Sequence, residues 1–214
     1  MSPRESAPTC APITPDSPHY PTGPRAVLGR DAPATLTAIG NPAILANAPL
    51  ALLCSVRCPG AIILKAYDLA VALRDNGVPV AGGFHSPMER ECLRVLLRGA
   101  QPVIVCPARG VEGMRVPAAW RTPIEQGRLL IVSPFQRGRR ATQALAVERN
   151  RFVAALAAAV FVAHATPGGK TEALCREVVT WGKPLYTFDT PDNDNLLALG
   201  ALPCDSGHIS VLGS

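Results

Sequence analysis

The sequence predicts an α/β protein built on a doubly wound, mainly parallel sheet with helices on both faces. Two observations support this prediction. From about Leu36 onward, short apolar runs of strand length alternate with segments that carry helix signals. The runs are also nearly continuously apolar, as is typical of parallel strands buried on both faces. Alternation of strands and helices in this way implies right-handed crossovers within one sheet.

Six apolar runs are expected to form the strands of this sheet. In chain order they are 49–55, 78–83, 102–107, 129–134, 159–165 and 184–189. Their lengths fit strands, and they lie between turn residues such as proline and glycine.

The segments between these strands carry the start and stop signals of helices. "HSPMERECLRVLLRG" offers Ser86 as N-cap, Pro87 at the first helical position and Glu89 as the partner of a capping box. "PGAIILKAYDLAVALRDNG" places its large apolar residues on one helical face and ends at Gly77. "GGKTEALCREVVTWG" both begins and ends on glycine. The pattern as a whole is Rossmann-like.

The chain is expected to form one such domain, residues 36–214, preceded by an N-terminal arm, residues 1–35. The arm is rich in proline and poor in large apolar residues, which indicates a mobile tail or a loosely docked segment. No apolar run is long enough to span a bilayer, and the N-terminus lacks the apolar region of a secretory signal. We therefore expect a cytoplasmic protein that does not bind membranes.

The seven cysteines are expected to be reduced. Four of them, Cys54, Cys92, Cys106 and Cys175, lie within apolar patterns, where cysteine behaves as a small hydrophobe. Cys54 and Cys58 form an isolated CxxxC pair without the second ligand pair of a zinc site, so no metal is expected. Whether Cys58, beside the expected pocket, is reactive stays open at this level.

The formal net charge of +5 mildly favours an anionic partner. The sequence lacks a GxGxxG fingerprint, and "GGKT" lacks the upstream spacing of a Walker A loop. These absences argue against an ordinary dehydrogenase or ATPase. No cofactor is expected.

The loops after the strands are the places to look for a ligand, because doubly wound sheets bind ligands beyond the carboxyl ends of their strands. These loops read "CSVRCPG", "GGFHSPME", "SPFQRGRR" and "HATPGGKTE". Three of the four hold glycine and small hydroxyl residues just before a helix. Such a loop offers close backbone approach and free N–H groups, which suit a phosphate, although ordinary strand–helix turns use the same residues.

Arg149 is the most informative single residue. On a helix from Thr142 to Ala158 it falls on the same stripe as Leu145 and Phe152, so its guanidinium points inward. A buried guanidinium needs a counterpart. That counterpart is either a buried acid such as Glu89 or a phosphate, and both hold if the acid positions the arginine.

The "RGRR" segment, which contains Arg137, Arg139 and Arg140, has two interpretations. Arginines in a glycine-containing loop are usually just solvated. Beside Arg149, the same arginines could instead follow a phosphate backbone.

These residues resemble the DNA-processing protein A (DprA/Smf) family, over about residues 36–200. The best match is the tripeptide Arg149–Asn150–Arg151 followed by "FVAALAAAVFVAHA". "GRLLIVSP", "GGFHSPMERECL" and "GGKTEALCREVVTWGKPLYTFD" are similar to the family's strand before a proline-rich turn, its glycine-rich loop with an acid, and its last helix and strand.

The resemblance implies a protein that binds single-stranded DNA in a basic pocket, forms a homodimer and passes DNA to the recombinase RecA during transformation. Carried over by position, the implied DNA contacts are Ser55, Gly83, Arg149, Asn150 and Arg151. The family's arginine after the first strand is displaced here by one position, to Arg57. Together with the loop argument, the expected phosphate-binding set also contains Arg57, Gly82, Arg140, Gly168, Gly169 and Thr171, with Glu89 as the acid that orients the arginines.

A second interpretation comes from "ATPGGKTEALCRE", a shortened version of the PGGxGTxxE motif of LOG-type nucleotide-binding proteins. In that case Glu172 is the catalytic residue that hydrolyses a nucleoside monophosphate to base and ribose phosphate, while an arginine holds the 5′-phosphate. The sequence therefore leaves three hypotheses: DNA binding, binding or hydrolysis of a nucleotide, and a purely structural or signalling role.

Overall fold

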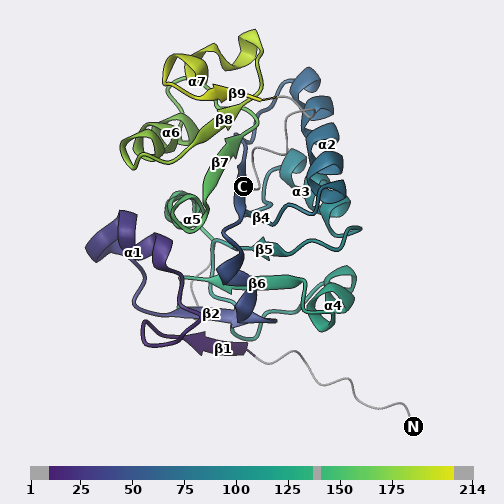
Figure 1. Cartoon of the computed structure of the whole chain (residues 1–214), viewed down its shortest axis with the longest axis vertical. Coiled ribbons are helices and arrows are strands. Elements are labelled where there is room, and N and C mark those ends of the chain that lie inside the picture. The colour runs from purple at the N-terminus through teal and green to yellow at the C-terminus, as the bar shows by residue number, and fades with distance from the viewer. Residues whose placement is uncertain (1–9, 137–140, 205–214) are drawn as a thin grey trace.

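A computed structural model of the chain describes residues 10–136 and 141–204. Arg137, Arg139 and Arg140 lie outside the described residues. Within these two ranges the chain forms a nine-stranded sheet in the order β1-β2-β6-β5-β4-β3-β7-β8-β9 (Figure 1). The strands are β1 (Cys10–Ile13), β2 (Leu36–Ile39), β3 (Leu50–Leu53), β4 (Val80–Gly82), β5 (Val103–Val105), β6 (Leu129–Ser133), β7 (Ala159–Val162), β8 (Leu185–Thr187) and β9 (Leu202–Pro203).

All six predicted strands are present, as β3 to β8, and they pair in parallel. Every residue of β3, β6 and β7 is buried, as expected for strands covered on both faces. The sheet contains three further strands. β9 pairs in parallel with β8, whereas β2 pairs antiparallel with β6, and β1 pairs antiparallel with β2. The doubly wound, mainly parallel fold is confirmed.

Helices cover both faces of the sheet. The helices are α1 (Thr22–Leu28), α2 (Gly60–Asp75), α3 (Pro87–Leu96), α4 (Ala118–Glu125), α5 (Gln143–Leu156), α6 (Lys170–Thr180) and α7 (Asp194–Ala198), with 3-10 turns η1 (Gly29–Asp31), η2 (Pro42–Asn47) and η3 (Pro191–Asn193). In Figure 1, α2, α3 and α4 lie on one side of the sheet, and α1, α5 and α6 lie on the other. The buried apolar residues accordingly form two clusters, one under each helical layer.

Local sequence signals place the helix starts. Ser86 caps α3 by accepting a hydrogen bond from the Glu89 N–H, and the Glu89 carboxylate accepts one from the Ser86 N–H, so the predicted capping box is present. Thr142 caps α5 by accepting a hydrogen bond from the Leu145 N–H. The predicted helix at 142–158 is therefore correct in position.

The described part of the N-terminal arm is docked on the domain. Besides the pairing of β1, Tyr20 is 8% exposed and its hydroxyl donates to the Pro33 carbonyl. A Cβ atom on Gly23 would come within 2.6 Å of the Ala155 carbonyl oxygen, so α1 lies very close to the end of α5. In this structure residues 10–35 therefore pack on the domain, and β1 adds an edge strand to the same sheet.

None of the helices in the described ranges is long and apolar enough to cross a membrane.

Candidate phosphate-binding site

The strand order reverses direction between β3 and β7. These two strands are parallel neighbours, but the chain continues from β3 to β4 on one side and from β7 to β8 on the other. The loops that leave their carboxyl ends therefore diverge and open a crevice, which is where doubly wound sheets bind ligands.

A cavity of about 300 Å³ occupies this crevice. Its walls come from the loops after β3, β4 and β7, one face of α5 and the first residues of α6. The lining residues are Cys54, Ser55, Val56, Arg57, His85, Ser86, Glu89, Gln143, Ala146, Val147, Arg149, Asn150, Thr166, Gly169, Lys170 and Thr171. We call it the crevice cavity. Three lining side chains are cationic and one is acidic, so it suits an anion.

Arg149 is a buried cation in this wall, and Glu89 is buried to the same extent. Arg149 is only 4% exposed, and its Nη1 donates to the Cys106 carbonyl oxygen at 3.0 Å. Its Nε has no hydrogen-bond partner within the described ranges. An unpaired buried N–H of a guanidinium is costly unless an acceptor reaches it, which indicates a ligand that the protein alone does not supply.

Gly83 makes room for the Arg149 guanidinium. A Cβ atom at position 83 would lie 1.5 Å from Nη1, so any other residue would displace the arginine. Gly82, the last residue of β4, is packed less tightly, with its nearest neighbour at 3.0 Å from the added Cβ. The glycine pair was predicted to contact phosphate through its backbone. In the structure, neither glycine is among the residues that line the crevice cavity, and Gly83 leaves room for the guanidinium.

Glu89 does not pair with Arg149. Its carboxylate accepts hydrogen bonds from the backbone N–H groups of Cys54, His85 and Ser86 at 3.1, 2.9 and 2.9 Å. No ion pair joins it to Arg149 in the part of the chain that the structure describes. The expected role as an orienting acid is therefore indirect, because Glu89 fixes the loops after β3 and β4 rather than the arginine itself.

The N-terminus of α6 provides backbone donors. Its N-cap, Gly169, makes no side-chain cap hydrogen bond, and Gly169 and Thr171 both line the crevice cavity. The first N–H groups of a helix have no partner within the helix and favour an anion. Gly168 contributes differently: it adopts a left-handed φ of 70°, and its N–H donates to Glu172.

Ser55 ties the two diverging loops together at the cavity. Its Oγ accepts a hydrogen bond from the Thr166 N–H at 3.1 Å, and its own N–H donates to the His164 carbonyl oxygen at 2.9 Å. Arg57 lies further along the same loop, is exposed, and also lines the cavity. Its guanidinium is therefore available to a ligand.

The structure separates the two arginines of the RNR tripeptide. Asn150 lines the crevice cavity with Arg149, and its Oδ1 is buried without a partner in the described ranges. Arg151 does not line the cavity. Its Nε donates to Glu177 on α6 at 2.7 Å, and its Nη1 lies 3.8 Å from Asp31. Arg140, which was also predicted to bind phosphate, lies outside the described residues.

Glu172 is engaged by its own neighbours. It is 5% exposed, and its two carboxylate oxygens accept hydrogen bonds from the Asn195 amide, Arg176 and the Gly168 N–H. The Asn195 amide first, and then Arg176 and Gly168, lower the pKa of this carboxyl below its usual value. Glu172 does not belong to the residues that line the crevice cavity. It stabilises the turn before α6.

Five polar residues of the cavity wall were not among the predicted binding residues: His85, Ser86, Gln143, Thr166 and Lys170. Lys170, at the first position of α6, is exposed and provides the third cationic side chain. Gln143 lies in the first turn of α5. The signal for Lys170 was present, since it lies within the quoted "GGKT" loop between Gly169 and Thr171.

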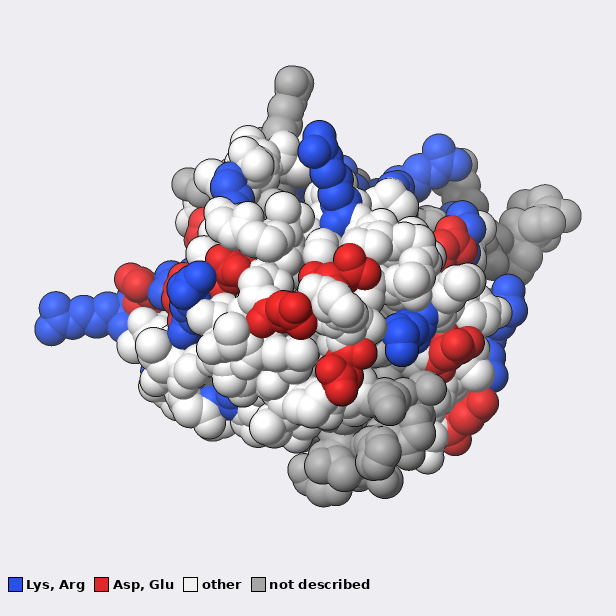
Figure 2. Space-filling view, turned by 90° about the horizontal axis from the view of Figure 1, so that it is seen from above, with Lys and Arg blue, Asp and Glu red and all other residues white. Residues whose placement is uncertain are grey.

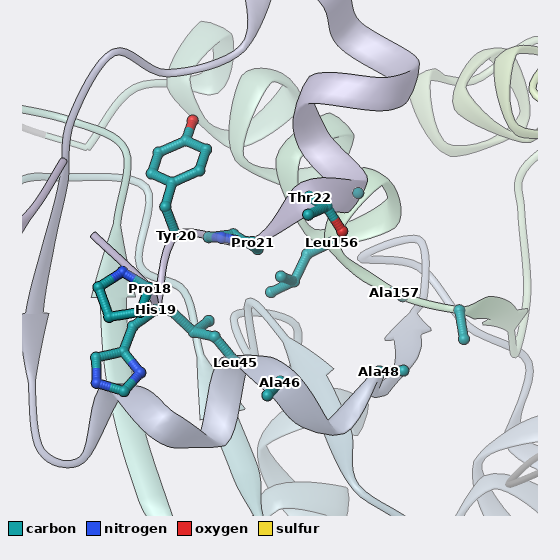
Figure 3. Close-up of a pocket in the computed structure, with 12 residues that line it drawn as sticks. Pro18, His19, Tyr20, Pro21, Thr22, Leu45, Ala46, Ala48, Leu156 and Ala157 are labelled. Carbon is teal, nitrogen blue, oxygen red and sulfur yellow. The ribbon is translucent and has the colours of Figure 1, made fainter. Parts of the chain in front are cut away.

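A second cavity, of about 390 Å³, lies at the opposite edge of the sheet. Ala48, two residues before β3, and Ala158, immediately before β7, line it. Figure 3 shows Leu156, at the end of α5, pointing into the space between Pro21 and Ala46. This cavity is bordered by the docked arm, and its labelled walls are mostly proline, alanine and leucine, which offer no charge to an anion.

The end of the molecule that carries α7 and β9 has a mixed charge. Figure 2 shows acidic and basic side chains interspersed on this face. The segment from β8 to α7 contributes Asp189, Asp192 and Asp194. The acidic side chains on this face oppose a phosphate backbone and the basic ones attract it, so the face gives no clear electrostatic preference for DNA.

The chain matches the model of the family described as DNA recombination-mediator protein A over residues 11–194. The chain therefore belongs to this family, in agreement with the resemblance of its sequence. Membership supports a role in DNA processing. No curated protein sequence matches the chain.

Solved structures show the same fold. DNA processing protein A (DprA) from Streptococcus pneumoniae superposes with a TM-score of 0.79 at 19% identity, covering 94% of this chain and 73% of that one. DNA processing protein A from Helicobacter pylori, described for its single-stranded DNA binding mode, gives 0.74 at 18% identity, covering 91% and 90%. The molybdenum cofactor binding protein of Rippkaea orientalis gives 0.53 at 11% identity, covering 77% and 94%.

Proposed function

We propose that this protein binds single-stranded DNA through its sugar-phosphate backbone at the crevice cavity. The observation that carries the proposal is Arg149, a buried cation with an unpaired Nε in the wall of a cavity at the switch point of the sheet. A phosphate oxygen is an acceptor of the kind that this donor lacks. Family membership supports DNA as the source of that phosphate.

The remaining walls favour phosphate contacts over base contacts. Arg57, in the loop after β3, and Lys170, the first residue of α6, are exposed cations that line the cavity. Within the described ranges, no phenylalanine, tyrosine or tryptophan lines the cavity, and the imidazole of His85 is the one ring in its wall, so base stacking has little support. We therefore expect binding that is largely independent of sequence and strongly dependent on salt.

The test is a fluorescence-anisotropy titration of a labelled oligo-dT strand at several salt concentrations, with a nucleoside monophosphate as competitor. Each lost phosphate contact lowers the slope of log K against log salt by roughly 0.7 for a single strand. Arg57→Gln and Lys170→Gln each remove one exposed cation from the wall, so each should reduce both affinity and slope. Lys65→Gln, an exposed cation on α2 outside the cavity, is the matched control and should change neither.

Affinity that does not depend on salt, or equal losses in all three variants, would contradict the proposed site. Absence of DNA binding, together with a thermal shift caused by the mononucleotide, would favour the LOG-type interpretation instead. The position of Glu172, hydrogen-bonded to Asn195, Arg176 and Gly168 and outside the cavity wall, gives that interpretation no support.

Assembly as a homodimer and transfer of DNA to RecA belong to the same proposal, and family membership is their support. Light scattering coupled to size-exclusion chromatography tests the first. RecA filament formation on coated single-stranded DNA tests the second, and a protein that leaves filament formation unchanged would contradict it.

A further inference from the structure

Two thiols flank the loop segment that lines the crevice cavity, and one of them, Cys54, belongs to the cavity wall. Cys54 follows the last residue of β3, and Cys58 precedes Pro59, the N-cap of α2. The chain between them bends at Val56 and Arg57 and forms neither helix nor strand. This bend returns Cys58 to Cys54, and the two side chains are hydrogen-bonded to each other.

The two thiols have different surroundings. Cys54 is buried, 8% exposed, and lies beside the loop that Glu89 holds. Cys58 is half-buried, and its Sγ lies 3.7 Å from the Pro59 carbonyl oxygen. It also lies just before the first turn of a helix of 16 residues, where the positive end of the dipole favours a thiolate.

These surroundings shift the pKa values of the two thiols in opposite directions. The hydrogen bond from Cys54 lowers the pKa of the Cys58 thiol, against desolvation and the nearby Asp192, which raise it. The same hydrogen bond, followed by burial, raises the pKa of the Cys54 thiol. Cys58 therefore has the properties of a thiolate that attacks an oxidant. Cys54 has those of a thiol that then reacts with the oxidised Cys58 to form a disulfide.

Other cysteines lack this combination. Cys92, Cys106 and Cys175 are buried, and burial raises the pKa of each thiol to about 12. Cys10 is half-buried like Cys58, but burial and Glu112 raise its pKa. Cys10 provides a natural control, because it is about as exposed as Cys58 but lies beside Glu112 rather than beside a second thiol.

We propose that Cys54 and Cys58 form a peroxide-sensitive redox site that closes to an intraloop disulfide on the wall of the crevice cavity. The Cys58 thiolate attacks hydrogen peroxide, which leaves a sulfenic acid on Cys58 and releases hydroxide. The Cys54 thiol then attacks the sulfenic sulfur, forms the S–S bond and releases water. Both sulfurs are oxidised, the peroxide is reduced, and a dithiol reductant reverses the step.

This disulfide spans the segment that lines the cavity. Ser55, Val56 and Arg57 lie between the two cysteines, and all three belong to the cavity wall. The redox state of the pair therefore sets the conformational freedom of this wall. The chemistry depends only on the two thiols, so it can be tested whether or not DNA is the ligand.

The test is brief treatment of the reduced full chain with a small excess of hydrogen peroxide, followed by alkylation and mass spectrometry. We expect a mass loss of about 2 Da before alkylation, a decrease of two in the number of alkylated cysteines, and a peptide crosslinked between Cys54 and Cys58. Reduction with dithiothreitol should restore all seven thiols. No crosslink, with Cys58 unmodified or overoxidised to sulfinic acid, would overturn the proposal.

Variants separate the roles of the two sulfurs. Cys54→Ser should leave a sulfenic acid on Cys58 that a dimedone probe traps, whereas Cys58→Ser should abolish both the crosslink and the labelling. Cys10→Ser should behave like the unmodified chain. Equal dimedone labelling of Cys10 and Cys58 in the Cys54→Ser variant would show that exposure alone decides reactivity, and would also overturn the proposal.

Discussion

Replacement of Arg149 by methionine should reduce DNA binding and leave the fold nearly as stable as before. Methionine matches much of the length of the arginine and removes both the charge and the unpaired Nε. The structure shows one hydrogen bond from Arg149 to the protein, to Cys106, and this loss costs about 1 kcal/mol. Removal of a buried, incompletely paired cation offsets much of that cost. We expect the free energy of unfolding to change by about 1 kcal/mol or less.

The same substitution should have a much larger effect on affinity. A charge-assisted hydrogen bond to phosphate contributes about 1.5–3 kcal/mol, which corresponds to roughly a 10- to 150-fold rise in Kd. The assay is oligo-dT anisotropy beside urea denaturation of the same preparations. Arg151→Met is the matched control: it removes an arginine two positions away that pairs with Glu177, so Kd should stay within about threefold.

A different pattern of results would refute this reasoning about Arg149. Loss of more than about 3 kcal/mol of stability would show that the residue has a structural role, because the single hydrogen bond to Cys106 cannot account for it. An equal loss of affinity in the Arg151→Met variant would place the DNA elsewhere.

Three further substitutions test the supports of the site and of the domain. Gly83→Ala should weaken oligo-dT binding about as much as Arg149→Met, because its Cβ would occupy the position of Nη1; unchanged affinity would show that the guanidinium can relocate. Glu89→Gln should lower the free energy of unfolding, measured in urea, by about 1.5–3 kcal/mol, because an amide cannot accept all three backbone hydrogen bonds. The control is Glu91→Gln, which removes only an exposed ion pair with Arg94. Burial lowers the pKa of Lys183 from 10.5 to about 8. Between pH 8 and pH 10.5 the unfolded chain therefore binds more protons than the folded one, so the free energy of unfolding should rise with pH over this range. This rise should be limited to about 1 kcal/mol, because Lys183 is partly exposed and its ammonium donates to the carbonyl oxygens of Ala154, Ala155 and Ala157. A Lys183→Met variant whose unfolding free energy depends on pH in the same way would show that Lys183 is not the cause.

The sequence could predict features that depend on neighbours along the chain. The capping box of Ser86 and Glu89 spans three residues, and the inward direction of Arg149 follows from the helical period. Six parallel strands were predicted because burial on both faces leaves an apolar run with no alternation. The antiparallel strands β1 and β2 were not predicted, because β1 is an edge strand that contains Pro12 and the four-residue run of β2 is interrupted by Thr37.

The difference between Arg149 and Arg151 could also have been predicted from the helix alone. Residues two positions apart point to nearly opposite sides of an α-helix, so both could not enter one cavity. The resemblance treated the RNR tripeptide as a unit and assigned both arginines to DNA. The structure shows that one lines the crevice cavity and the other pairs with Glu177.

By itself, the sequence determined the fold class, the positions of the main strands and helices, and the edge of the sheet where a ligand belongs. Only the tertiary structure decided which groups meet there. Gly83 accommodates an arginine 66 positions later, and Glu89 holds the N–H of Cys54. The bend at Val56 and Arg57 brings Cys58 back to Cys54. Periodicity and caps are local and are repeated along the chain, whereas contacts between distant loops depend on how the sheet brings their strands together.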